Sequence, residues 1–138
     1  MVKGDVRQSN QNVGNAGLFY VCFELTKRGW NVLPTSRNAR GIDIVAYSHD
    51  GTRTITIQVK SLSRRSPVPF GSNMDSMIAE YIVVCRSVFS DKPECFIAKK
   101  DNMLMKIHKG ENEGRISYWL APRDYEVFKN QWELIGDG

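Results

Sequence analysis

Three polar residues, Asp43, Gln58 and Lys60, have the chemistry needed to handle a phosphate group, and a hairpin would bring them together. The dipeptide Asp50-Gly51 lies between them and is among the strongest short signals for a tight hairpin turn. A two-residue loop there places Asp43 directly opposite Gln58, and opposed residues on antiparallel strands share one face of the sheet. Lys60 follows Gln58 by two residues and lies on the same face, because side chains alternate along a strand. A register slip of one residue would separate Asp43 from Gln58.

The atoms of this cluster favour a divalent metal site beside a cation. The oxygens of Asp43 and Gln58 suit Mg²⁺ or Mn²⁺ and are poor ligands for zinc or copper. The Lys60 ammonium can hold a phosphate oxygen, or take a proton from water once its pKa is depressed. A metal that polarises a phosphate, next to a Lys that offsets the developing charge, is an arrangement that cleaves phosphodiesters. The alternative is that Thr54, Thr56, Gln58 and Lys60 form the solvated face of an ordinary strand.

The order of a helix, a strand, G-I-D-I-V-A, a hairpin and I-Q-V-K-S resembles the core of the PD-(D/E)XK nucleases, the restriction-endonuclease-like superfamily. The resemblance is clearest over residues 13–61 and is strongest to branches related to Holliday-junction resolvases and intron-associated endonucleases. It implies that Asp43 binds Mg²⁺ or Mn²⁺, that Gln58 replaces the second acid, and that Lys60 is catalytic. It also implies that the carbonyl of Val59 is a metal ligand and that the substrate is DNA. A Gln in place of the acid occurs in some branches of the superfamily.

One departure from the superfamily bears on activity. Such nucleases often carry a Glu that reaches the metal from the first helix, in a G-x-x-G-E pattern. Residues 14–18 read Gly-Asn-Ala-Gly-Leu, so Leu18 occupies the position of that Glu, within an apolar stripe of the helix. Glu24, the acid of this helix, lies six residues further on, roughly 240° away around the axis. Asp43 is then the single charged ligand, which predicts metal binding that is weak or dependent on the substrate phosphate.

Composition limits the remaining function classes. A chain of 138 residues with 41% hydrophobic and 25% charged residues is expected to form a single domain spanning residues 1–138. No apolar run approaches a transmembrane span, and the first residues do not resemble a signal peptide. Cys22, Cys85 and Cys95 are far apart and lie among apolar neighbours, so we expect reduced core residues of a cytoplasmic protein.

Positive charge is concentrated in the half of the chain that holds the candidate site. Residues 1–66 contain ten Lys and Arg against four Asp and Glu, whereas the remainder contains nine against eleven. Guanidinium groups flank the candidate site in sequence and could seat a nucleic-acid backbone together with the neighbouring hydroxyl; the predicted contacts are Arg37, Arg40, Ser61, Arg64 and Arg65. The alternative is that each arginine is a solvated loop residue, and net charge alone does not decide between the two.

Local patterns predict the elements that must position these residues. We expect a first helix over residues 16–28, capped by Asn12 or Asn15 and ended by Gly29. Residues 61–73 are expected to be a long connection without regular structure. The other expected elements are strands at 30–34, 81–85, 95–98 and 116–120 and helices at 101–108 and 123–130. The C-terminal aromatic residues could stack on bases, but their spacing favours core packing.

Together these observations predict an α/β domain, with a restriction-endonuclease-like mixed central sheet flanked by helices. The expected function is metal-dependent hydrolysis of DNA phosphodiester bonds. The alternatives are a nucleic-acid-binding module or a protein-interaction module that kept the fold and lost the chemistry. Breaking both strands of a duplex would favour a homodimer.

Overall fold

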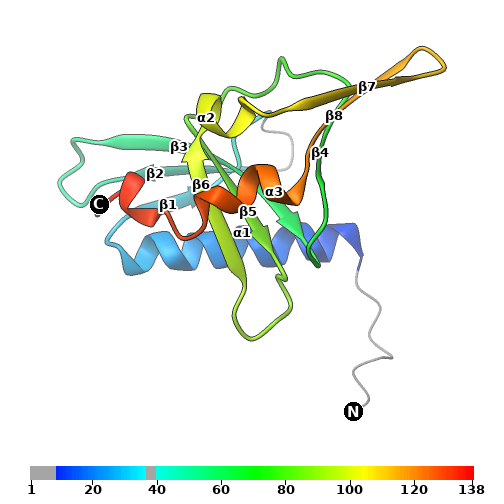
Figure 1. Ribbon diagram of the computed structural model, residues 1–138. Helices are drawn as coiled ribbons and strands as arrows, with labels where there is room; N and C mark the ends of the chain where they lie inside the picture. Colours follow the sequence, from blue (N-terminus) through cyan, green and yellow to red (C-terminus); the bar gives the residue numbers. More distant parts are fainter. Residues whose placement is uncertain (1–8, 37–39) are drawn as a thin grey trace.

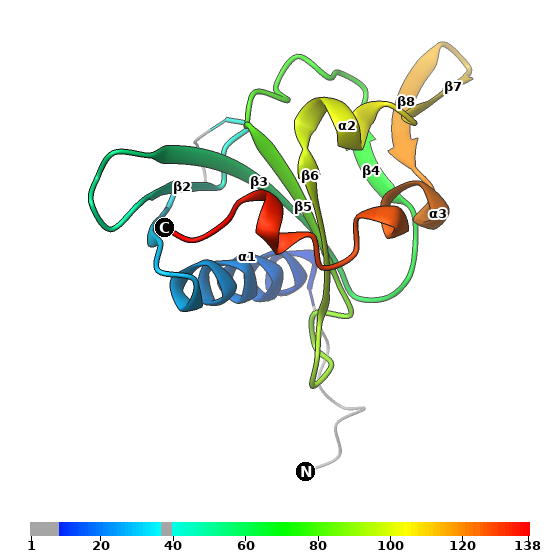
Figure 2. The same ribbon diagram turned by 60° about the vertical axis from the view of Figure 1, so that its left-hand side comes forward.

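The central element of the computed structural model, which describes residues 9–36 and 40–138, is a five-stranded sheet in the order β1-β2-β3-β5-β6 (Figures 1 and 2). Its strands are β1 (Asn31–Pro34), β2 (Ile44–Tyr47), β3 (Thr54–Leu62), β5 (Tyr81–Arg86) and β6 (Glu94–Lys99). The β3–β5 pair is parallel and the other three pairs are antiparallel. The predicted mixed sheet with flanking helices is therefore confirmed.

Helix α1 (Asn10–Lys27) covers one face of this sheet and begins six residues earlier than predicted (Figure 1). The N-cap is Ser9, whose hydroxyl oxygen accepts a hydrogen bond from the Asn12 backbone N–H at 3.0 Å. The predicted caps, Asn12 and Asn15, lie inside the helix. The helix ends as expected at Gly29, which has a φ of +89° and follows the C-cap residue.

The β2–β3 hairpin has the register predicted from the sequence, although its loop is longer. Ile44 pairs with Ile57 and Tyr47 with Thr54. The connection is a four-residue loop over 49–52, and Asp50 stabilises it because its Oδ1 accepts from the Thr52 N–H at 3.0 Å. A four-residue loop centred on the same two residues leaves the register unchanged.

A second, three-stranded sheet in the order β4-β8-β7 lies beside the central sheet (Figures 1 and 2). Its strands are β4 (Val68–Gly71), β7 (His108–Asn112) and β8 (Arg115–Leu120). The prediction of an irregular connection over 61–73 was wrong, because β3 continues to Leu62 and β4 pairs with β8. The predicted helix over 101–108 was wrong in its bounds, since α2 spans Lys100–Leu104 and His108 already belongs to β7.

The C-terminal segment folds into short helices, α3 (Pro122–Tyr125), η2 (Glu126–Phe128) and η3 (Trp132–Leu134), in place of the longer helix predicted over 123–130. One apolar cluster lies between α1 and the sheet, and a second packs the opposite face against β4, β8, α2 and α3. The fully buried side chain of Tyr125 belongs to the second cluster, and the nearly buried Trp132 belongs to the first. Both positions agree with the expectation of core packing.

All three cysteines are buried free thiols. No helix within residues 9–36 or 40–138 is long and apolar enough to cross a membrane.

Candidate functional site

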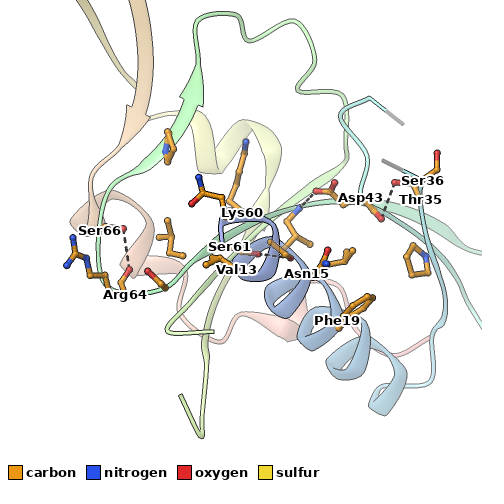
Figure 3. A pocket seen from close by; sticks show the side chains of 18 residues that line it. Val13, Asn15, Phe19, Thr35, Ser36, Asp43, Lys60, Ser61, Arg64 and Ser66 are labelled. Atoms are coloured by element: carbon orange, nitrogen blue, oxygen red, sulfur yellow. Dashed lines mark hydrogen bonds between the residues drawn. The ribbon is translucent and has the colours of Figure 1, made fainter. Parts of the chain in front are cut away.

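A pocket of about 950 Å³ lies over the first turns of α1, the end of β3 and the loop that follows it (Figure 3). The residues that directly follow β1, Thr35 and Ser36, close one side, and Arg64 and Ser66 lie at the other end. Its wall mixes polar and apolar side chains from four segments that are distant in sequence. This is the size range of small-molecule sites in proteins, roughly 300–1,000 Å³.

Asp43 lines this pocket from the residue just before β2. Its backbone N–H donates to the Ile57 carbonyl at 2.9 Å, and its own carbonyl accepts from the Thr35 N–H at 2.9 Å. The carboxylate oxygen Oδ2 accepts from the Val59 backbone N–H at 2.7 Å, a contact visible in Figure 3. These bonds hold the carboxylate at the open end of the β2–β3 pair, because the strand pairing begins at the next residue, Ile44.

Gly41 makes this position possible. Its φ is +73°, and a Cβ at this residue would lie 2.0 Å from the carbonyl oxygen of Ser76. A side chain here would therefore force the loop that carries Asp43 away from its neighbour.

Lys60 also lines the pocket, from β3. Its Nζ lies 4.9 Å from the centre of the Phe70 ring, so the ammonium has an aromatic face as a neighbour. Burial lowers the pKa of Lys60 below its ordinary value, and attraction to the Asp43 carboxylate opposes that shift only in part. The side chain is thus closer to losing its proton at neutral pH than a solvated lysine is.

Gln58 shares the β3 face of Lys60 but does not line the pocket. Its side-chain oxygen Oε1 is buried and has no hydrogen-bond partner among the described residues. Such an atom normally finds a donor or a cation, because an unpaired buried acceptor is costly. The structure thus brings Asp43, Val59 and Lys60 to one pocket and leaves Gln58 next to them with an unsatisfied oxygen.

The oxygen atoms of Asp43, Gln58 and the Val59 carbonyl are of the type that binds a hard divalent cation. In a β-strand, the N–H and the C=O of one residue point toward the same neighbouring strand. The N–H of Val59 faces Asp43, so its C=O points to that side as well. Carboxylate, amide and peptide oxygens are the ligands that Mg²⁺ prefers. The charge is low, however: no group of three or more His, Cys, Asp or Glu residues forms a metal cluster in the described part of the chain.

Helix α1 approaches the end of β3 closely. A Cβ at Gly17 would lie 1.9 Å from the Ser61 hydroxyl oxygen, so only glycine permits this packing. Leu18, the next residue, lines the pocket with a partly buried side chain. Glu24 is buried elsewhere on the helix, where it accepts from the Tyr20 hydroxyl at 2.8 Å and pairs with Arg28. No helix carboxylate therefore replaces the one missing at position 18.

The predicted nucleic-acid contacts differ in where the structure places them. Ser61 and Arg64 line the pocket. Arg40 is exposed and does not line it, whereas the Arg65 guanidinium makes a bidentate ion pair with Glu126 at 2.9 and 3.0 Å. Arg37 lies outside the described residues.

The sequence reasoning missed several pocket residues, above all Phe19 and Asn15 on α1. Figure 3 shows both side chains on the part of the helix that borders the pocket. The signal was their spacing of four residues, which places two side chains on one helix face.

No protein-family model matches this sequence, and no curated protein sequence matches it either. Solved structures match the fold, among them two nucleases. One is a bacterial homing endonuclease, I-Ssp6803I, with a TM-score of 0.64, 17% identity, and coverage of 94% of this chain and 92% of that one. The other is Hjc, a Holliday junction resolvase from the archaeal hyperthermophile Archaeoglobus fulgidus, with a TM-score of 0.56, 17% identity, and coverage of 86% and 99%. The chain therefore has the restriction-endonuclease-like fold that its sequence motifs resemble.

Proposed function

We propose that this protein is a metal-dependent endonuclease that hydrolyses DNA phosphodiester bonds. The observation that carries the proposal is that the Asp43 carboxylate and the Lys60 ammonium face one pocket at the end of one hairpin. Two nucleases share the fold in which this pocket lies. The three buried free thiols fit a cytoplasmic location.

Each residue has a role that follows from its position. Asp43, the Val59 carbonyl and Gln58 would hold Mg²⁺ or Mn²⁺. The ion would supply charge to polarise the phosphate and to acidify a bound water. Asp43 is oriented for this by the Val59 N–H, which occupies one carboxylate oxygen and leaves the other available.

Lys60 serves the reaction in either protonation state. As an ammonium it offsets negative charge that develops on the phosphate oxygens. As a neutral amine, which its lowered pKa makes more accessible, it accepts the proton of the attacking water.

The DNA backbone would reach this centre along the side of the pocket lined by Ser61 and Arg64. In the proposal, Arg40 and Arg65 contact more distant phosphates, with Arg65 leaving Glu126 or sharing it. Arg37 belongs to the same set, and a homodimer would act on both strands of a duplex.

A second candidate function is DNA binding without hydrolysis. The observation that favours it is Leu18, an apolar side chain on the pocket wall at the position where related nucleases carry a Glu. A site with one charged carboxylate binds a divalent ion less tightly than a site with two.

Cleavage assays separate the two functions. Plasmid, branched and single-stranded DNA are incubated with the protein in Mg²⁺ and in Mn²⁺. Nicking or cleavage that disappears in Asp43→Asn supports the nuclease. Asp91→Asn, an exposed acid in the β5–β6 loop, is the matched control and should retain activity. DNA binding by wild type that survives in Asp43→Asn, with no cleavage by either protein, would instead support the binding module.

A further inference from the structure

We propose that Phe19 and Asn15 on α1 form a binding site for one unstacked DNA base beside the Asp43–Lys60 centre. The preferred substrate would then be DNA with an unpaired nucleotide at the cleavage position, not a continuous duplex. This inference rests on the proposed nuclease function, because it places the base next to the phosphate that is cut.

Phe19 is the unusual residue of this pocket. Its side chain is 60% exposed although it lines a pocket whose other wall holds charged groups. Phe23, one helical turn further on, is 57% exposed but does not line the pocket, and Lys27 Nζ lies 5.1 Å from its ring centre. The two phenylalanines thus differ in the surface that they face and not in exposure.

The neighbours of Phe19 suit a nucleobase. Asn15 precedes it by one turn, and its amide can both donate to and accept from a base edge. Pro34, on the strand across the pocket, adds an apolar surface. The volume of about 950 Å³ exceeds what one phosphate and a hydrated ion would fill, so there is space for a base and its sugar.

The pairing state of the substrate follows from the geometry of stacking. Base faces inside a duplex are covered by their neighbours, so an aromatic ring on a pocket wall can stack only on a base that has left the helix. Extruding a paired base has an energetic cost that an unpaired base does not incur. A protein that binds a base on Phe19 should therefore favour single-stranded or locally unpaired DNA.

Binding is measured by fluorescence anisotropy in EDTA, so that no cleavage occurs, on three labelled DNAs of one sequence context. These are a single strand, a full duplex and a duplex with one unpaired nucleotide. Wild type should bind the first and third more tightly than the full duplex. Phe19→Ala should weaken binding to those two by about 5- to 150-fold, and the matched control Phe23→Ala should not.

Two further measurements distinguish stacking from a structural effect. Phe19→Tyr should retain binding and Phe19→Leu should lose it, because only the first keeps an aromatic face. Replacing single nucleotides by abasic residues should remove the effect of Phe19→Ala at one position of the DNA and at no other. Equal affinities for Phe19→Ala and Phe23→Ala would overturn the base site, and so would an effect that does not depend on any one base.

The outcomes also separate this inference from the proposed function. If wild type cleaves DNA through Asp43 while the Phe19 variants bind like the Phe23 control, the nuclease stands and the base site is refuted. If Phe19-dependent binding is found without any cleavage, the base site stands as a DNA-binding site only, and the nuclease is refuted. Failure of the wild type to bind any of the three DNAs in EDTA, together with no cleavage of any of them in Mg²⁺ or Mn²⁺, refutes both.

Discussion

The substitution Leu18→Glu tests whether α1 can contribute a ligand to the proposed metal centre. Leu18 lines the same pocket as Asp43, so a Glu there adds a second carboxylate near the first. Losing the partial burial of Leu18 costs about 1 kcal/mol. If the two carboxylates lay ~8 Å apart, their repulsion would add about 2 kcal/mol at an effective dielectric constant of ~20. The variant should therefore lose roughly 3 kcal/mol of stability without metal, which typical domains of this size survive.

A divalent ion should reverse most of this loss. An ion that binds only the folded state at a hundred times its Kd stabilises it by about 2.7 kcal/mol. Thermal melts of wild type and Leu18→Glu are compared in EDTA and across titrations of Mg²⁺ and Mn²⁺. At roughly 4 °C per kcal/mol, the variant should melt about 12 °C lower without metal and recover most of that difference with it.

The control for this experiment is Phe23→Glu, which places an acid on the same helix at an exposed position that does not line the pocket. It should change the melting temperature little and should not respond to metal more than wild type does. If Leu18→Glu loses the same stability with and without metal, position 18 lies outside the coordination sphere. That result would weaken the proposal that Asp43 binds a metal in this pocket.

Three further predictions concern charge. Lys60→Met should be more stable than wild type at pH 7, because burial lowers the Lys60 pKa and the charged form destabilises the fold. In denaturant titrations, this difference in stability should shrink as the pH rises toward ~10.4, where the lysine of the unfolded chain also loses its proton. Arg64→Gln should reduce the log–log salt slope of DNA binding by about one unit, and Arg65→Gln should reduce it less because Glu126 already holds that guanidinium. Hydrogen bonds from Arg65 and Arg86 lower the Glu126 pKa to about 2. The stability that this carboxylate contributes is therefore present at pH values above the ordinary pKa of a Glu and is lost as the pH falls toward 2. Glu126→Gln should melt at a lower temperature than wild type at pH 7 and at nearly the same temperature below about pH 3.

The features that the sequence predicted well are those set by local chemistry. Asp50-Gly51 specified a turn centre, and any loop with that centre aligns Ile44 with Ile57. Gly29 ends α1 because its φ of +89° disfavours other residues. Such signals act over a few residues and do not depend on tertiary context.

The features that the sequence concealed depend on contacts between distant segments. Strand β4 contains Pro69, which argues against a strand, yet its pairing with β8 at an irregular register accommodates that residue. The start of α1 was missed because Asn12 and Asn15 are themselves favourable N-cap residues and Gly14 lowers helix propensity, whereas the N-cap in the structure is Ser9. The role of Gln58 was also beyond local reasoning: register placed it beside Asp43, but only the packed structure shows its Oε1 buried and unpaired.

In the proposed nuclease, the charge of the site would link metal binding to substrate binding. Asp43 is the only carboxylate residue among the described residues that line the pocket, so the remaining negative charge for a divalent ion has to come from elsewhere. A substrate phosphate in the pocket is the natural source, because Ser61 and Arg64 line the path by which it would arrive. Linkage is reciprocal: if the phosphate raises the affinity for the ion, the ion raises the affinity for DNA by the same factor. A second carboxylate at position 18 would supply part of that charge from the protein, so Leu18→Glu should weaken this mutual dependence as well as strengthen metal binding.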